Sequence, residues 1–168
     1  MCTGGVIDEA LSAGEGLSVA AGLRVMDSVL DLLNGPAIGD LEAASLGDVV
    51  ESLAGLSGKL AAARAAVLVR FDAGRGYTAD GYGSSAAWLA ARTRATRKAA
   101  GTEVRRMRQL AAHPLIAGAV ARGEVSESWA DDLARRTSKL PADWRDDVDK
   151  LLVDTAAAGA AFPAPGPR

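Results

Sequence analysis

Apolar side chains recur every three to four residues along most of the chain, the spacing that places them on one face of an α-helix. The first stripe covers residues 17–33 and stops at Asn34, just before a Gly-Pro pair that would end a helix. A longer stripe covers residues 46–71, and Ser45 stands in the position of its N-cap. The pattern therefore predicts two helices in the first 71 residues, the second of them long.

The remaining helices are predicted by caps and breakers. Ser84 or Ser85 caps a short helix, and a break at residues 93–96 leads into a longer helix that ends near His113 because Pro114 follows it. Three more helices are expected over residues 115–121, 129–137 and 141–152; Gly123 closes the first, Ser126 caps the second and Pro141 begins the third. The whole pattern predicts an all-α fold of about six or seven helices in one compact domain.

Composition supports helices over strands. Hydrophobic residues make up 49% of the 168 residues, but 36 of them are alanine and only seven are aromatic. Alanine is the strongest helix former, whereas strands favour β-branched and aromatic side chains. Within the long second helix, Gly55 and Gly58 each weaken the helix by about 1 kcal/mol relative to alanine, and a close crossing with another helix is the expected reason for them.

The two ends of the chain differ from this core. Residues 1–16 are glycine-rich and residues 158–168 have the Pro/Gly/Ala composition of a linker, so both are expected to be disordered tails around a helical domain at residues 17–157. No uninterrupted apolar run reaches the ~18 residues of a membrane span, and the N-terminus lacks the basic start of a signal peptide. These features predict a cytoplasmic protein without membrane contact.

Charge is strongly partitioned along the chain although the net charge is only -2. Residues 64–122 carry eleven basic and three acidic side chains, whereas residues 1–63 and 123–168 carry net charges of -7 and -3. The basic middle has two interpretations. It could contact the phosphates of a nucleic acid, or it could be neutralised by the acidic helices of the same chain.

The basic side chains gather around the break at residues 93–96. Projected at about 100° per residue, the side chains of Arg94, Arg97, Lys98, Arg105 and Arg108 fall within an arc of about 100°, beside an apolar arc that includes Val104 and Met107. With the short helix before it, this segment has the outline of a helix-turn-helix whose second helix is basic. The candidate nucleic-acid-binding residues are Arg92, Arg94, Arg97, Lys98, Arg105 and Arg108.

The sequence offers little for catalysis. His113 is the only histidine and is expected to be structural, because it stands before a proline and no carboxylate or thiol cluster is evident beside it. Two groups of acidic residues have the spacing of solvated helix faces: Asp131-Asp132, and Asp143 with Asp146-Asp147 and Asp149. No catalytic residue, metal site or cofactor is therefore predicted for this chain.

Two elements in the chain resemble a known family. Residues 81–90 read GYGSSAAWLA and residues 121–130 read ARGEVSESWA, in that order and on either side of the arginine-rich helix and the His113 break. Over residues 41–152 the chain is similar to the actinobacterial domain-of-unknown-function family 222 (DUF 222), which precedes HNH endonuclease domains and occurs in the related mycobacterial repeat proteins. The resemblance implies a helical accessory domain of proteins that handle DNA, with the HNH residues themselves absent from this chain.

The resulting hypothesis is a non-catalytic helical module that associates with DNA through its arginine-rich helix and that could adjoin a downstream nuclease domain. Two alternatives remain open. The apolar stripe of the 46–71 helix could pair with a protein partner or with a second copy of the chain, or the chain could be a truncated remnant without independent function.

Overall fold

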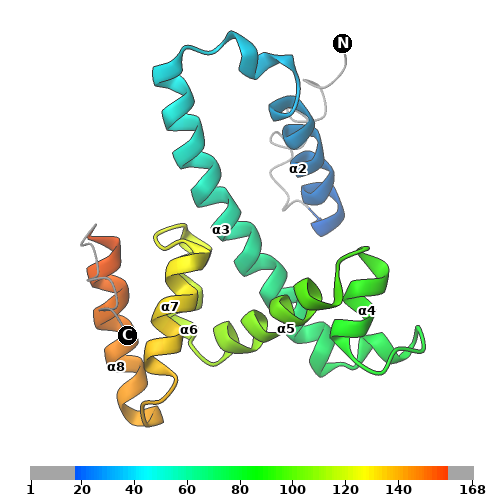
Figure 1. The fold of residues 1–168 in the computed structure, drawn as a ribbon, viewed down its shortest axis with the longest axis vertical. Coiled ribbons are helices and arrows are strands. Elements are labelled where there is room, and N and C mark those ends of the chain that lie inside the picture. The colour runs from blue at the N-terminus through cyan, green and yellow to red at the C-terminus, as the bar shows by residue number, and fades with distance from the viewer. Residues whose placement is uncertain (1–17, 159–168) are drawn as a thin grey trace. The chain divides into compact units, whose positions relative to one another are not determined.

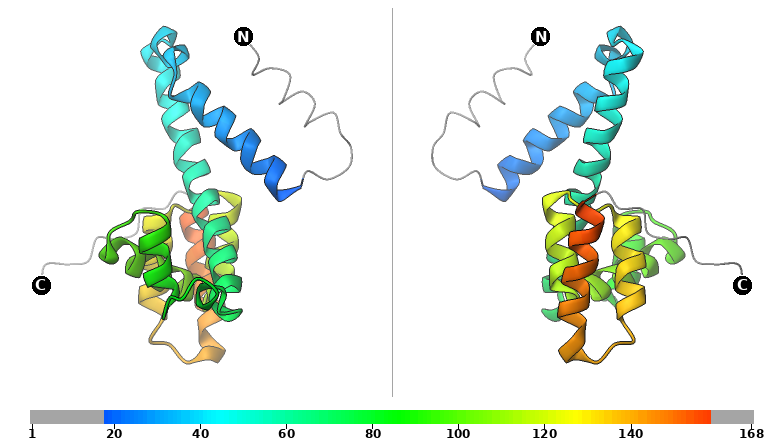
Figure 2. Two further views of the ribbon diagram at one scale, coloured as in Figure 1. Left: turned by 90° about the vertical axis from the view of Figure 1, so that its right-hand side faces the viewer. Right: turned by 90° about the vertical axis from the view of Figure 1, so that its left-hand side faces the viewer.

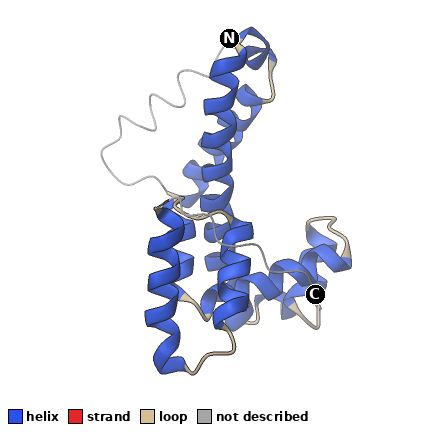
Figure 3. Cartoon of the chain, turned by 60° about the vertical axis from the view of Figure 1, so that its left-hand side comes forward, coloured by secondary structure: helices blue, strands red, loops and turns tan. Residues whose placement is uncertain are grey.

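The computed structural model describes residues 18–158, and within them the chain is helical without strands (Figures 1 and 3). The seven described α-helices are α2 (Val19–Leu33), α3 (Ala43–Ala73), α4 (Ser85–Arg92), α5 (Arg97–Ala111), α6 (Pro114–Arg122), α7 (Glu127–Thr137) and α8 (Ala142–Ala157). Two short 3-10 helices, Pro36–Asp40 and Gly76–Thr78, flank α3. The prediction of an all-α fold with six or seven helices is confirmed; the predicted tails lie outside the described residues, except for Ala158, which caps α8.

Contacts divide the chain into two units that meet inside α3, one up to Val50 and the other from Glu51 onward. In the first unit, the Ser18 hydroxyl accepts a hydrogen bond from the amide of Ala21 and starts α2. The helix ends at Asn34, whose backbone N–H donates to the carbonyl of Leu30, and the N–H of Gly35 donates to the carbonyl of Leu32. The predicted limits of this first helix are therefore confirmed to within two residues.

Several predicted caps start the helices of the second unit. The hydroxyls of Ser84 and Ser126 accept hydrogen bonds from the amides three residues further on, and His113 directly precedes Pro114, the first residue of α6. Gly123 ends α6 in the left-handed conformation with φ 77°, which favours glycine. These four boundaries could be read from the sequence because each depends on neighbouring residues alone.

The start of α3 differs from the prediction. The helix begins at Ala43, two residues before Ser45, because the amide of Leu46 already donates to the carbonyl of Glu42 at 3.1 Å. Ser45 thus lies within the first turn and is not the N-cap. Alanine at positions 43 and 44 extends the helix at little cost, which the capping-box pattern did not take into account.

The second unit has two apolar clusters, both built on α3. The larger one joins α3 to α6, α7 and α8 and is centred on the fully buried Ile116 and Leu133. Figure 2 shows α6, α7 and α8 side by side in this part of the molecule. The smaller cluster joins the end of α3 to α4 and α5 through Leu68, Leu89 and Val104.

Of the α3 glycines Gly55 and Gly58, for which the sequence predicted a close helix crossing, Gly58 has the expected role. A Cβ on Gly58 would lie 3.6 Å from the carbonyl oxygen of Val125 and 3.8 Å from a methyl group of Val120, so the helix passes close to the α6–α7 connection there. A Cβ on Gly55 would meet nothing within 4 Å. The close-crossing explanation is therefore confirmed at Gly58. At Gly55 the helix also runs near Gly123, whose Cβ would lie 3.6 Å from the Gly55 carbonyl oxygen, but this approach does not require the absence of a side chain on Gly55.

Helix α3 is long and apolar enough, by length and composition, to cross a membrane. The sequence prediction missed this because it considered only uninterrupted apolar runs. Part of the helix packs against the protein, since Ala62 and Leu68 are buried in the two clusters of the second unit. Packing in the second unit thus accounts for Ala62 and Leu68, whereas Leu60 and Val67 of the same half remain exposed.

Candidate nucleic-acid interface

Helices α4 and α5 are joined by a four-residue turn whose conformation is fixed by its own side chains. The Thr93 hydroxyl donates to the carbonyl of Leu89 at 2.7 Å and closes α4. Arg94 takes the left-handed conformation with φ 55°, which is uncommon for a residue with a side chain. The Thr96 hydroxyl then accepts from the amide of Ala99 at 3.2 Å and starts α5. A short helix, a tight turn and a longer helix therefore follow one another, as predicted.

Helix α5 has one buried face. Ala100, Val104, Met107 and Leu110 are buried, the first three against α3 and α4 and Leu110 in the cluster with α6 to α8. The helix is therefore held from both sides by the second unit. The neighbouring face must point outward, which is where the sequence placed the cations.

All six predicted binding residues are exposed. Arg92 is the last residue of α4, Arg94 lies in the turn, and Arg97 and Lys98 open α5. On α5 alone, the four cations at positions 97, 98, 105 and 108 still span an arc of about 100°. The placement of Arg94 on the same helical face is wrong, because the left-handed turn at this residue interrupts the helix.

Few of these cations are engaged by the protein itself. Among the described residues, only Arg108 of the six has a carboxylate within 4.0 Å, at 3.4 Å from Asp72, and its side chain remains 66% exposed. Arg105 makes a single 3.5 Å contact with the hydroxyl of Thr102. The interpretation in which acidic helices neutralise this face is therefore not supported at these positions in residues 18–158.

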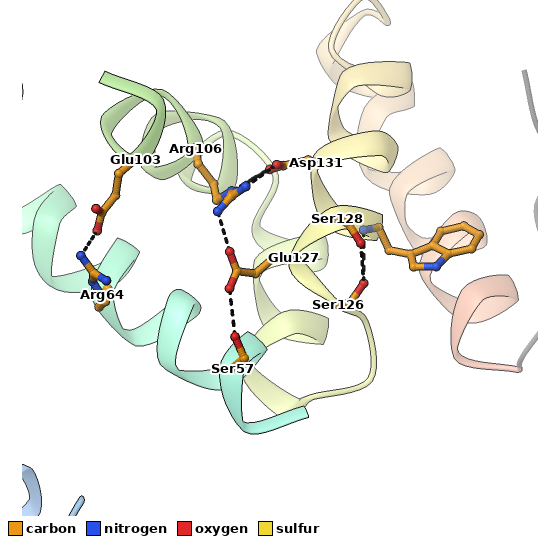
Figure 4. A network of polar contacts seen from close by, with 9 residues as sticks. Ser57, Arg64, Glu103, Arg106, Ser126, Glu127, Ser128 and Asp131 are labelled. Atoms are coloured by element: carbon orange, nitrogen blue, oxygen red, sulfur yellow. Dashed lines mark hydrogen bonds and ion pairs between the residues drawn. The ribbon is translucent and has the colours of Figure 1, made fainter. Parts of the chain in front are cut away.

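The acidic helices do engage Arg106, the neighbouring arginine (Figure 4). Its guanidinium lies between Glu127 at 2.5 Å and Asp131 at 2.6 Å, and Nε also donates to Asp131 at 3.0 Å. The hydrogen bonds to Asp131 raise the pKa of Arg106 above its ordinary value, against the opposing effect of burial. This side chain fastens α5 to α7 and is directed away from the exposed basic face, since it lies about 100° from Arg105 on the helix.

A second part of the same network reaches α3. The Ser57 hydroxyl donates to Glu127 at 3.4 Å, and Arg64 pairs with Glu103 at 2.6 Å (Figure 4). Both contacts join α3 to the helices that follow it in the second unit. The acidic residues of α7 thus have a structural partner inside the fold, and the sequence pattern gave no signal of which arginine this would be.

Asp72 is the acidic residue that contacts the basic face among the described residues. One of its carboxylate oxygens accepts a hydrogen bond from the buried hydroxyl of Ser85, and the other faces Arg108. Asp72 lies near the end of α3 and Ser85 opens α4, so the carboxylate links three elements. Its negative charge lowers the positive potential at the Arg108 end of the face.

His113 has a partner that sequence reasoning missed. Its Nδ1 lies 2.7 Å from Oδ2 of Asp149, and Thr137 Oγ1 lies 3.3 Å from the same nitrogen. The side chain of His113 is 2% exposed and that of Asp149 is 0% exposed. Asp149 was interpreted as part of a solvated acidic face, and this is wrong because α8 turns that position inward.

The buried His113 group does not have the geometry of a catalytic relay. In a catalytic triad the carboxylate contacts one ring nitrogen of the histidine and the nucleophilic hydroxyl contacts the other. Here Asp149 and Thr137 both contact Nδ1, so Thr137 is not placed as a nucleophile. Thr137 instead donates to the carbonyl of Leu133 at 3.3 Å. The burial of His113 and Asp149 also keeps a substrate away from them, which leaves a structural role.

The remaining acidic side chains form no metal centre within residues 18–158, where no three histidine, cysteine or acidic side chains lie close enough together to hold an ion. Asp132 instead contacts Arg135 and Arg136 on its own helix. The hydrogen bond from Arg136 is the largest of several effects that lower the pKa of Asp132, and burial opposes them.

No family model, curated protein or solved structure matches the chain. The resemblance to domain-of-unknown-function family 222 therefore stays a prediction that rests on the two sequence elements at residues 81–90 and 121–130.

Proposed function

We propose that this chain is a non-catalytic, DNA-associated helical module of the kind that accompanies HNH nucleases. The α4–α5 segment would contact the DNA backbone, with α5 in the position of the second helix of a helix-turn-helix. The residues proposed to meet phosphates are Arg92, Arg94, Arg97, Lys98, Arg105 and Arg108.

One observation carries this proposal: the cations of α5 divide into two sets by direction. Arg106 is fastened to acidic side chains of α7, whereas Arg97, Lys98 and Arg105 are exposed and have no described carboxylate within 4.0 Å. Arginine suits phosphate because its planar guanidinium can bind two oxygens at once and stays charged. An unpaired cationic face on a well-packed helix is therefore a suitable surface for a polyanion.

Fluorescence anisotropy with a labelled DNA duplex tests the proposal. If four to six of these cations meet phosphates, the logarithm of the binding constant should fall with the logarithm of salt concentration with a slope of about -4 to -5. The triple variant Arg97→Ala/Arg105→Ala/Arg108→Ala should bind much more weakly and with a slope smaller in size by about 3.

A matched control removes the same charge from other surfaces. Arg24, Lys139 and Lys150 are exposed and lie on α2, after α7 and on α8. The variant Arg24→Ala/Lys139→Ala/Lys150→Ala should keep the slope of the parent chain. Equal losses in both triple variants, or no duplex binding by the parent at low salt, would contradict the proposal.

A second candidate function is a protein-interaction or oligomerisation module. Leu53, Leu56 and Leu60 recur at helical spacing on α3 and are exposed in the structure. Helical stripes of this kind pair with partner helices when their apolar side chains remain uncovered. Light scattering that shows a stable dimer indifferent to DNA would favour this function over the first.

A further inference from the structure

Gly101 lies at the centre of the basic face of α5. Counted at about 100° per residue from Arg97, Gly101 points at about 40°, between Arg108 at about 20° and Arg105 at about 80°. In this projection Gly101, which has no side chain, therefore lies between two arginines of the basic face.

Packing does not explain this glycine. Apart from its chain neighbours and the backbone of its own helix, no heavy atom lies within 4 Å of the place that a Cβ on Gly101 would take. Gly58 is different, because its Cβ would touch the α6–α7 connection. The conformation of Gly101 is ordinary helix, so no left-handed backbone requires glycine there either. The residue weakens α5 relative to alanine without a structural benefit within the described residues.

A surface hollow of about 310 Å³ adjoins Gly101. Arg105 and Arg108 line it on α5, and Ser84 lines it on the α4 side. The glycine thus opens onto a space that two guanidinium groups border. The Asp72 carboxylate beside Arg108 is already engaged by the hydroxyl of Ser85.

We infer that a phosphodiester of the DNA backbone passes directly over Gly101 and is held between Arg105 and Arg108. Glycine is the residue that permits the closest approach of another backbone, because it has no side chain to displace. The two flanking guanidinium groups can then each offer paired N–H donors to the phosphate oxygens. This inference rests on the proposed function and adds the place of closest contact.

The substitution Gly101→Leu tests the inference without altering any charge. Leucine is a good helix former and its Cβ would meet nothing within 4 Å at this position, so the Tm should rise by about 2–4 °C. Binding to a labelled duplex should weaken by about tenfold, with a salt slope smaller in size by about 1, because the leucine side chain keeps one phosphate away from the arginines. Gly101→Ala, with less bulk, should weaken binding by a smaller factor.

Gly47→Leu is the matched control, since Gly47 is an exposed helical glycine that, like the half-buried Gly101, has nothing within 4 Å of its Cβ position. It should leave duplex binding unchanged. The inference is overturned if Gly101→Leu binds like the parent chain, or if Gly47→Leu binds equally poorly. The proposed function survives in those cases as long as the parent binds the duplex and the Arg97/Arg105/Arg108 triple variant does not, whereas a parent that fails to bind overturns both.

Discussion

His113 and Asp149 meet inside the protein, 36 residues apart in sequence, with Nδ1 of the imidazole 2.7 Å from Oδ2 of the carboxylate. The histidine stands at the start of α6 and the aspartate in the middle of α8, and Thr137 from the end of α7 contacts the same nitrogen. Three helices of the second unit therefore converge on one polar group in an otherwise apolar cluster. Within the described residues, the other oxygen of Asp149 is buried without a hydrogen-bond partner.

This pair should be important for stability. Removal of one partner from a buried pair leaves the other unsatisfied, so His113→Ala should lower the free energy of unfolding by about 3–5 kcal/mol. Urea denaturation followed by circular dichroism measures this. The double variant His113→Ala/Asp149→Ala should lose less than the sum of the single variants, and additive losses would show that the two side chains are not coupled.

Arg106 should matter for folding and not for DNA. The Arg106→Ala variant leaves Glu127 and Asp131 without their cation, and because the group is 31% exposed we expect a loss of about 1–2 kcal/mol. Binding of a labelled duplex should change far less than in Arg105→Ala, which removes a neighbouring arginine of equal charge from the exposed face. A larger loss of DNA affinity in Arg106→Ala than in Arg105→Ala would contradict this division of roles.

Neutralising Asp72 should strengthen DNA binding. The substitution Asp72→Asn keeps an oxygen that can accept from Ser85, yet it removes the negative charge that faces Arg108 at 3.4 Å. Duplex affinity at ~50 mM salt should rise by about threefold, and the gain should shrink at higher salt because the effect is electrostatic. An unchanged affinity at both salt concentrations would show that Arg108 does not contact DNA.

Asp132 should contribute to the fall of stability in acid. Its pKa is lowered in the folded state by the hydrogen bond from Arg136 and by Arg135, so the stabilisation is complete above the unfolded pKa near 3.8 and is lost as pH falls through the lower folded pKa. Asp132→Asn should therefore cost about 0.5–1 kcal/mol at pH 6 and less at pH 3. Urea midpoints at the two pH values measure the difference, and a constant loss at both would refute the assignment.

Serine should be able to replace Thr96 as the N-cap of α5, whereas alanine should not. Thr96→Ala removes the hydroxyl that accepts from the Ala99 amide and should lower the free energy of unfolding by about 1 kcal/mol. Thr96→Ser keeps the acceptor and should lose little. If both variants were equally destabilised, the methyl group of Thr96 would be the stabilising feature and the hydrogen bond would not.

Local signals in the sequence were sufficient for most helix boundaries, with the start of α3 as an exception, and for the direction of the exposed cations on α5. The caps at Ser84 and Ser126 and the breaker at Pro114 act on backbone groups within a few residues, so their effects could be predicted without knowing the fold. The same holds for the basic arc of α5, because helical periodicity alone separates Arg105 from Val104. The prediction from periodicity failed at Arg94, because a left-handed turn at this residue interrupts the helix.

Pairing between distant segments was decided only by the tertiary structure. Nothing in the chain indicates that Glu127 and Asp131 would take Arg106 and leave Arg105 to solvent, or that Asp149 would turn inward to meet His113. Both outcomes depend on how α5, α7 and α8 pack around shared apolar side chains, and that packing fixes which polar groups come within hydrogen-bonding distance. The sequence by itself determined which segments are helical and which face of α5 is cationic; the packed helices decided which of those charges remain available to a partner, since an ion pair forms only between groups that the fold brings together.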